Sequence, residues 1–551
     1  MTAASTLPGA TLLRVGNLSE LVAKQVQQQP ERTAIGTSDR RIVITYRQLE
    51  GLVHSAAAQL SSFGLKGGDT VALVSDNSIE FVLGFLATVT LGARVAPLNP
   101  ALTSTELSAR LSQLSAQAVL IPRHLANQSD FARLPENISS WIMDLGGTST
   151  SSAIRIVGNL GRTLRSGATG DSDKRINSDD IALLLFTGGT TGAPKLVPLT
   201  HRNIRTSVEN ICRTYALSAD DATLMVMPLF HGHGLIAGLL STLASGGSAY
   251  VPSTGTFSAH SFWPDVVRLS VTWYTAVPTI HRILLNRASN EYPRSSPVPL
   301  RFIRSCSAPL DEVLAAAIAT TFRTPLISAY GMTETSHQVS SNPLPTDGMN
   351  RMSSVGLASG VEIRIVGESQ KDVPYGEIGE IWVRGATVTA GYLNNPEAND
   401  ASFVDGWFRS GDLGSQDEDG YIFVRGRLKE MINRAGEKIS PRDIDAVLLS
   451  HPKVLEAASF GEADAMYGEN VQAAVILRPG TQATECGLRD YCRTRLSAFE
   501  VPLRIYIVGA FPRTAKGSTD RHALALQFAS SRSTSSDTAR KGVSPVQCDA
   551  K

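Results

Sequence analysis

The sequence predicts an α/β fold in which helices cover largely parallel β-sheets. Helical patterns at residues 46–61 and 78–91 alternate with short apolar strands at residues 70–75 and 93–97. Parallel strands need a crossover between them, so this alternation indicates a parallel sheet. The chain has 551 residues, which is too long for one ordinary core, and we therefore expect two or more domains.

The rest of the chain changes character twice. Residues 146–180 are rich in Ser, Thr, Gly and Arg, and we interpret them as a connecting surface segment. Residues 361–407 contain short strands bounded by glycine turns, which is typical of an antiparallel β subdomain. A smaller α/β unit follows, with helices at 442–450 and 486–496 and strands at 454–460, 472–477 and 503–508. Residues 530–551 are predicted to be a disordered tail.

Composition excludes several classes of function. The chain is 42% hydrophobic and 18% charged with a formal net charge of +1, which indicates a soluble globular protein without bulk attraction for nucleic acid or acidic membranes. The most apolar segment, residues 81–98, contains two glycines and an arginine and is not a membrane span. The N-terminus lacks a secretory signal and the C-terminus is not an SKL peroxisomal signal, so we expect a cytoplasmic enzyme. The sequence gives no indication of the oligomeric state.

One loop carries the strongest chemical signal. An apolar strand runs into a segment whose donors are Thr187, Gly188, Gly189, Thr190, Thr191, Gly192 and Lys195. Glycines remove the Cβ atoms that keep backbone N–H groups away from an anion, and the threonines and the lysine add hydroxyl donors and a mobile cation. We therefore expect the loop to hold polyphosphate. It is not a Walker A loop, because GxxxxGK[ST] cannot be threaded through it.

A second motif, residues 330–335, follows a predicted strand. Ligands of α/β sheets collect at the carboxyl ends of strands, so the side chains of Thr333 and Glu334 are well placed for chemistry. We expect Thr333 to donate to a phosphate and Glu334 to hold the magnesium ion that accompanies ATP.

The order of these motifs resembles the adenylate-forming superfamily of acyl-CoA synthetases, luciferases and peptide-synthetase adenylation domains. Residues 187–195, 330–334 and 407–412 are similar to its [ST]GT-TG-x-PK, YGxTE and WFxTGD motifs, and the resemblance covers about residues 20–528. The chain departs from the family pattern at Gly188 and Leu196. The resemblance implies ATP, Mg²⁺ and coenzyme A as cofactor and co-substrates, and a small carboxylic acid as substrate.

The resemblance also implies residue roles and domain limits. Nucleotide contacts fall on Ser307, Ala308, Pro309, Tyr330, Asp412 and Arg427, with Asp412 accepting the ribose hydroxyls, and the loop facing the pantetheine arm of CoA carries Gly436 and Lys438. Lys429 falls at the hinge. The implied domains are a large AMP-binding domain with a β subdomain (1–427), a small mobile α+β domain (428–529) and the tail (530–551).

Four segments, at 227–235, 273–281, 301–307 and 340–345, are similar to the oxalyl-CoA synthetases of fungi and plants. They imply a polar acyl site with His231, Ser305 and His337 around the substrate, His231 also being a candidate catalytic residue. A small acid with a second carboxylate needs such donors, because an unpaired buried charge is costly. We do not expect His231 and His233 to bind a metal, since no carboxylate or cysteine neighbours complete a site.

One catalytic segment breaks the family pattern. Where relatives carry a lysine that contacts the reacting carboxylate and the α-phosphate, this chain has Ser518, and Lys516 lies two residues earlier. Residues i and i+2 of an extended segment point to the same side, so we predict that Lys516 partly replaces the missing lysine. The sequence thus predicts an ATP-dependent carboxylic acid–CoA ligase acting on a short di- or polycarboxylic acid such as oxalate. Two alternatives stay open: an adenylating enzyme that loads a carrier protein in secondary metabolism, and a catalytically impaired nucleotide-binding relative.

Overall fold

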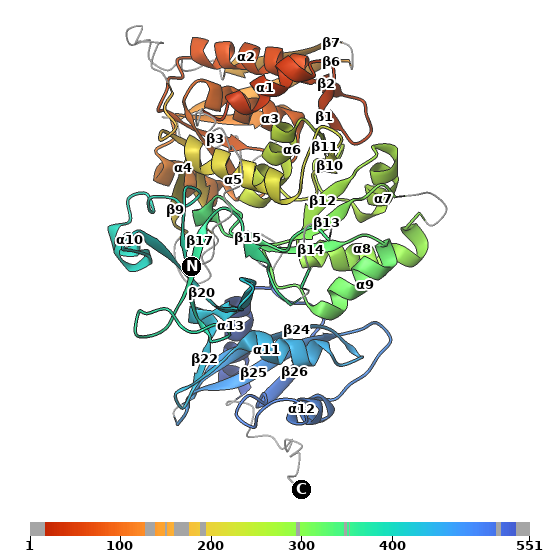
Figure 1. Cartoon of the computed structure of the whole chain (residues 1–551), viewed down its shortest axis with the longest axis vertical. Coiled ribbons are helices and arrows are strands. Elements are labelled where there is room, and N and C mark those ends of the chain that lie inside the picture. Colours follow the sequence, from red (N-terminus) through yellow and green to blue (C-terminus); the bar gives the residue numbers. More distant parts are fainter. Residues whose placement is uncertain are drawn as a thin grey trace, which may run out of the picture.

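The computed structural model describes residues 17–126, 138–148, 151–158, 176–187, 194–293, 298–345, 350–351, 353–464, 466–513 and 519–535. Two large sheets with their helices form the upper and middle parts of Figure 1, and the C-terminal elements form a separate layer at the bottom. The N-terminal two thirds of the chain therefore make one large α/β body.

The first sheet has seven strands within the described residues, in the order β7-β6-β5-β3-β4-β8-β9, and is parallel except at its two ends. Its strands are β3 (Thr70–Val74), β4 (Arg94–Leu98), β5 (Ala118–Pro122), β6 (Ser139–Thr148), β7 (Ser151–Gly158), β8 (Ile181–Phe186) and β9 (Leu196–Thr200). Helices of this region are α1 (Glu20–Gln28), α2 (Tyr46–Ser62), α3 (Ile79–Thr90) and α4 (Ser104–Leu114). Every residue of β3 and β5 is buried, as expected where helices cover both faces of a parallel sheet.

The second sheet runs β16-β15-β14-β13-β12-β10-β11-β1-β2, which is nine strands in the part of the chain described. Its strands are β1 (Thr33–Thr37), β2 (Val43–Thr45), β10 (Ala222–Leu224), β11 (Ser248–Val251), β12 (Trp273–Ala276), β13 (Phe302–Ser305), β14 (Leu326–Tyr330), β15 (Ser340–Ser341) and β16 (Leu357–Ala358). Associated helices are α5 (His201–Thr214), the π-helix η2 (His233–Leu240), α6 (Ser241–Ser245), α7 (Ala259–Arg268), α8 (Pro278–Glu291), α9 (Glu312–Phe322) and the 3-10 turn η3 (Thr333–Thr335). The parallel run β10–β12–β13–β14 brings four strand ends to one edge, where the site described below lies.

Two smaller sheets follow. The β subdomain contains β17 (Glu362–Val366), β18 (Gly379–Arg384), β19 (Phe403–Val404), β20 (Trp407–Gln416) and β21 (Ile422–Arg427), all antiparallel, with α10 (Pro396–Ser402). After the 3-10 turn η4 (Leu428–Glu430), the last unit contains β22 (Ile432–Arg434), β23 (Glu437–Ile439), β24 (Val454–Asp464), β25 (Gly468–Leu477) and β26 (Arg504–Ile507), with α11 (Pro441–Leu449), α12 (Glu485–Arg493) and α13 (Arg521–Ser535).

The predicted arrangement of parallel α/β sheets, a β subdomain and a smaller C-terminal unit is confirmed, and one local interpretation is wrong. Residues 146–158 are not a simple connection, because β6 and β7 pair as an antiparallel hairpin. Its inward residues Ile154 and Ile156 are buried and alternate with exposed positions, a period-two pattern that the polar composition obscured. Residues 159–175 lie outside the described part of the chain.

The C-terminal boundary also differs from the expectation. Helix α13 continues to Ser535, past the limit at residue 529 predicted for the small domain, and residues 536–551 lie outside the described chain. Among the described residues, no helix combines the length and the apolar character that crossing a bilayer requires.

Candidate active site

The carboxylate of Asp412 joins the large sheet to the β subdomain. It is 3% exposed, accepts a hydrogen bond from the Tyr330 hydroxyl at 2.6 Å and pairs with Arg427 Nε at 3.1 Å. Burial, followed by the charge of Asp412, raises the pKa of Tyr330 well above its ordinary value, so the phenol stays a donor. Three residues predicted from separate motifs therefore meet at one point.

Glu334 and Lys195 meet at a second point. The Tyr392 hydroxyl donates to Glu334 Oε1 at 2.9 Å, and Lys195 Nζ lies over the Tyr392 ring, 4.1 Å from its centre. Burial lowers the pKa of Lys195. The charge of Glu334 raises this pKa and the charge of Lys429 lowers it, so Lys429 also lies near Lys195. Sequence reasoning missed Tyr392, because no motif marks it.

The third cluster centres on Arg304, at the carboxyl end of β13, whose side chain is fully buried. Its Nε donates to the Tyr215 hydroxyl at 2.8 Å, Nη1 to Thr275 Oγ1 at 3.0 Å and Nη2 to Gln338 Oε1 at 3.0 Å. Among the described residues, no carboxylate forms an ion pair with it, although burying an uncompensated charge is expensive.

Two histidines complete this cluster. His233 Nε2 lies 3.3 Å from Arg304 Nη1, and His337 Nε2 lies 3.1 Å from Arg304 Nη2. A guanidinium can only donate, so both Nε2 atoms accept and the ring protons sit on Nδ1. His233 Nδ1 then donates to Ser307 Oγ, 3.0 Å away, which leaves the hydroxyl hydrogen of Ser307 for another acceptor.

Burial, and then the proximity of His337 and Arg304, lower the pKa of His233 well below its ordinary value. The two imidazole rings stack with centres 4.9 Å apart. This end of the site therefore carries one fixed positive charge and two neutral rings.

The backbone brings these side chains together at Gly331. A Cβ there would lie 1.3 Å from the carbonyl oxygen of His337, so only glycine allows the strand end to approach that residue. His337 itself has φ +86, a left-handed conformation that follows the η3 turn. The YGxTE motif thus positions His337 as well as Glu334.

The comparison with known families decides the identity of this arrangement. The chain matches the AMP-binding enzyme family over residues 22–393. The protein belongs to this family. A further match, to the AMP-binding enzyme C-terminal domain, covers residues 443–518.

Individual relatives narrow the class. The chain is 42% identical to an oxalate–CoA ligase of Arabidopsis thaliana over 523 residues, covering 93% of this chain and 98% of that protein. It is 38% identical to an oxalate–CoA ligase of Saccharomyces cerevisiae, covering 84% and 87%. The solved structure of ATP-bound MatB from Rhodopseudomonas palustris has a TM-score of 0.82 at 28% identity, covering 93% and 99%. The protein is an AMP-forming acid–CoA ligase, a class that uses ATP and CoA, and the predicted superfamily is confirmed.

The residues around Glu334 fit the magnesium ion expected with ATP in an AMP-binding enzyme. Among the described residues, no group of three or more His, Cys, Asp or Glu side chains forms a self-sufficient metal site. Mg²⁺ usually binds one or two carboxylates together with substrate phosphates and water. A single carboxylate beside a lysine suits an ion that arrives on a phosphate chain.

Other predicted residues are placed as follows. Thr187 and Lys195 lie at the two ends of the predicted phosphate loop, with Thr187 N donating to Lys195 O at 2.9 Å, while Gly188, Gly189, Thr190, Thr191 and Gly192 lie outside the described residues. Lys516 and Ser518 also lie outside the described residues.

The remaining predicted residues lie on two segments. Ser307, Ala308 and Pro309 follow β13. Gly436 and Lys438 lie on the hairpin of β22 and β23, where Lys438 pairs with Glu368 of the large domain.

His231 and Ser305 lie beside the Arg304 cluster. The ring of His231 contacts the ring of Phe230, with 4.7 Å between the ring centres, and His231 lies close enough to His233 to influence its pKa. The buried hydroxyl of Ser305 has no hydrogen-bond partner among the described residues. The three predicted acyl-site residues, including His337, are therefore brought into one region.

Sequence reasoning missed the centre of this cluster. Arg304 lies within the segment 301–307, which resembles the oxalyl-CoA synthetases, but no local pattern indicates the role of this arginine. The available signal is a lone arginine inside a short strand, Phe302–Ser305, whose four residues are all buried. Tyr215, Thr275 and Gln338, which accept from Arg304, come from distant parts of the chain and have no local signature.

Proposed function

We propose that this AMP-binding enzyme activates a small dicarboxylic acid, with oxalate as its best-supported substrate. One carboxylate of the acid attacks the α-phosphate of ATP, which forms an acyl-adenylate and releases pyrophosphate. The thiol of CoA then attacks the acyl carbon and releases AMP. Relatives named as oxalate–CoA ligases support this substrate.

The observation that carries the proposal is the unbalanced charge of Arg304. Its partners within the described chain are neutral hydroxyl, amide and imidazole groups. The second carboxylate of a dicarboxylic acid supplies the missing negative charge, whereas a long apolar chain would leave the charge uncompensated. This electrostatic argument favours a small dianion over a fatty acid.

Hydrogen-bond donors around Arg304 orient the second carboxylate. The Ser307 hydroxyl is free to donate because His233 supplies the proton on its other side. The buried hydroxyl of Ser305 is a second donor of the same kind. We propose that His231 and His337 complete the acyl site, with Arg304 acting mainly through the residues it orients and through its charge.

The nucleotide end has a corresponding set of roles. Asp412, held at both oxygens, accepts the ribose hydroxyls, and Arg427 is the neighbouring ribose and phosphate contact. Glu334 holds the magnesium ion, Thr333 donates to a phosphate, and the loop from Thr187 to Lys195 surrounds the phosphate chain. Ser307, Ala308, Pro309 and Tyr330 line the adenosine.

The small domain supplies the second half-reaction. We propose that it turns about Lys429, so that the hairpin with Gly436 and Lys438 faces the pantetheine arm of CoA. This chain has Ser518 where relatives carry a lysine, and Lys516 partly replaces that lysine. Its role is to neutralise charge on the phosphate during adenylation. Lys516→Ala is expected to abolish adenylation but to spare thioester formation from a supplied acyl-adenylate.

A panel of acids tests the proposal. Purified protein is incubated with ATP, Mg²⁺ and CoA together with oxalate, malonate, acetate or a long-chain fatty acid, and AMP release is measured. We expect the highest kcat/KM with oxalate and little release with the fatty acid. Faster release with the monocarboxylic acids would contradict the substrate assignment, and nucleotide binding without AMP release from any acid would favour a catalytically impaired relative.

A further inference from the structure

One buried asparagine connects the two large sheets. Asn77 lies three residues after the end of β3 in the first sheet, and 4% of its surface is exposed. Its side chain contacts the segment 225–229, which directly follows β10 in the second sheet. These hydrogen bonds join residues 148 to 152 positions apart in the chain, so they are tertiary contacts between the two sheets.

Every hydrogen-bonding group of the Asn77 side chain is directed at this segment. The Nδ2 group donates to the carbonyl oxygens of Met225 and Met227, at 3.0 Å each, and Oδ1 accepts from the N–H of Leu229 at 2.8 Å. An asparagine amide offers two N–H donors and one carbonyl oxygen, so both donors and the acceptor are used. The buried backbone of the segment needs such partners, because a buried polar group without one is costly.

The backbone holds Asn77 itself in place. The N–H of Asn77 donates to the carbonyl oxygen of Gly255 at 3.0 Å. The next residue, Ser78, is the N-cap of α3, and its Oγ accepts from the N–H of Phe81 at 3.1 Å. An N-cap fixes the point at which the chain enters a helix. The amide is therefore presented to the segment 225–229 from a fixed position.

The segment leads directly into the acyl site. The N–H of His231 donates to the carbonyl oxygen of Pro228 at 3.2 Å, and the π-helix η2 begins two residues later at His233. A Cβ on Gly234 would lie 2.3 Å from the same carbonyl oxygen, so the start of η2 packs tightly against the segment. Because His233 Nε2 lies 3.3 Å from Arg304 Nη1, a movement of the segment would change the distance between these two side chains.

We propose that Asn77 is a positioning residue for the acyl site, an inference that rests on the proposed function. Its amide fixes the segment 225–229, and the segment in turn sets His231 and His233 against Arg304. An apolar side chain of similar size would fill the same space but would leave two carbonyl oxygens and one N–H unpaired. Asn77 therefore affects binding of the acid through the two histidines rather than by a contact of its own with the substrate.

ATP–pyrophosphate exchange with oxalate tests this role. In Asn77→Ala, we expect KM for oxalate to rise about 10- to 100-fold, because three buried backbone groups lose their partner. KM for ATP should stay within about twofold of wild type, because the proposed nucleotide contacts lie on other elements. Asn77→Ser, whose hydroxyl keeps one donor and leaves room for a bridging water, should show the same pattern with a smaller rise. An unchanged KM for oxalate, or an equal rise of KM for oxalate and for ATP, overturns the inference.

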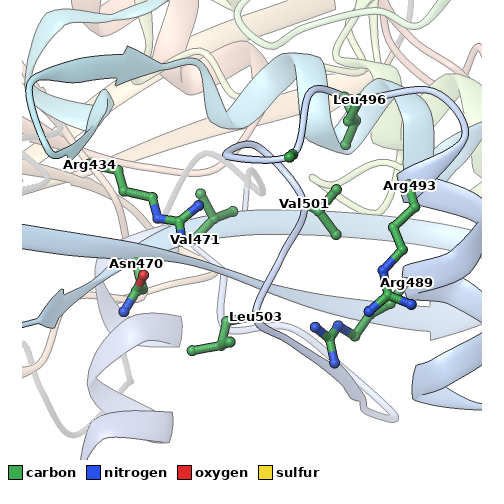
Figure 2. Close-up of a pocket in the computed structure, with 9 residues that line it drawn as sticks. Arg434, Asn470, Val471, Arg489, Arg493, Leu496, Val501 and Leu503 are labelled. Carbon is green, nitrogen blue, oxygen red and sulfur yellow. The ribbon is translucent and has the colours of Figure 1, made fainter. Parts of the chain in front are cut away.

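Asn470→Ala is the matched control. Asn470 lies on β25 of the small C-terminal unit, is 8% exposed and donates to Asp464, so this variant also loses a buried amide. It lines a pocket of that unit (Figure 2) and belongs to a different sheet from Asn77. The variant should leave KM for oxalate within about twofold of wild type. A rise as large as that in Asn77→Ala would mean that lost stability alone raises KM, and would overturn the inference.

Hydrogen–deuterium exchange of the full-length protein without substrates separates this inference from the proposed function. In Asn77→Ala, the amide of Leu229 should exchange at least about tenfold faster than in wild type, because its acceptor is lost. The amide of Phe81, which is held by Ser78, should keep its rate. Unchanged exchange at Leu229 overturns the inference whatever acid the enzyme uses. If wild type activates none of the acids, the proposed function fails, and exchange at Leu229 alone decides whether Asn77 holds the segment.

Discussion

The nucleotide end and the acyl end of this site are both strongly charged, but their charges are balanced differently. At the nucleotide end, Asp412 faces Arg427, and Glu334 lies near Lys195. At the acyl end, Arg304 is surrounded by neutral acceptors, and the described residues provide no carboxylate for it. One end is close to neutral before substrate arrives, and the other holds a net positive charge.

This difference follows the chemistry of the two ligands. ATP carries a divalent cation with it, so its site needs a carboxylate for the metal as well as cations for the phosphates. A small dicarboxylic acid brings no counterion to its second carboxylate. The protein must supply that charge, and it does so at the cost of burying Arg304. We therefore propose that substrate selectivity resides at the unbalanced end.

The largest effect is expected at the nucleotide end from Glu334→Gln. The amide still accepts the hydrogen bond from Tyr392 but cannot ligate Mg²⁺ as a carboxylate does, so adenylation should fall about 10²–10³-fold. Pyrophosphate exchange at increasing Mg²⁺ measures this, with Tyr392→Phe as the control that keeps the carboxylate. An unchanged exchange rate at saturating Mg²⁺ would remove Glu334 from the metal assignment.

A smaller effect is expected at the acyl end from Ser307→Ala. Loss of one hydroxyl donor to an anion should lower kcat/KM for oxalate about tenfold and that for acetate much less. Ser307→Thr, which keeps a hydroxyl, should recover part of the activity. A similar loss for both acids would mean that Ser307 serves the nucleotide alone.

The two ends should also differ in stability when an arginine is removed. Arg304→Met removes the donor that the buried groups of Tyr215, Thr275 and Gln338 share, so several buried acceptors are left unsatisfied and the melting temperature should fall markedly. Arg427→Met leaves the buried Asp412 without its cation and should lower the melting temperature. Asp412 keeps its hydrogen bond from Tyr330 in the second variant, so the loss there should be smaller. Scanning calorimetry compares the two variants, and an unchanged melting temperature in Arg304→Met would contradict the hydrogen-bond network around Arg304.

The smallest expected effect is the dependence of the protein's stability on pH. The lowered pKa of His233 means that the ring is neutral in the folded protein at pH 6.5, its ordinary pKa. The unfolded chain takes up a proton below that pH before the folded protein does, so stability is constant above about pH 6.5 and falls as the pH decreases. His201 and His281, with pKa values of about 4, act in the same direction.

Thermal melting between pH 7 and about pH 4 measures this slope. His201→Asn keeps an acceptor for the N–H of Leu18, which donates to His201 Nδ1 at 3.1 Å, and should flatten the slope. A melting temperature that rises on acidification through this range would contradict the assigned direction.

Local motifs mark the candidate residues of the nucleotide end more completely than those of the acyl end. The Gly/Thr loop, residues 330–334 and Asp412 lie on short segments whose chemistry is visible in the order of their residues. Arg304 takes its meaning from Tyr215 and Gln338, which are 89 and 34 residues away in the chain. The β6–β7 hairpin was missed for a related reason, because pairing between strands is not encoded in either strand alone.

Arg304 is the proposed countercharge for a second carboxylate, and the ratio of kcat/KM for oxalate to that for acetate measures this role. In Arg304→Gln, which keeps polar contacts but removes the charge, we expect this ratio to fall about 100-fold while pyrophosphate exchange with acetate persists. Arg282→Gln, at an arginine of α8 that pairs with Asp311 elsewhere, is the matched control and should leave the ratio unchanged. An unaltered ratio in Arg304→Gln would exclude Arg304 as that countercharge.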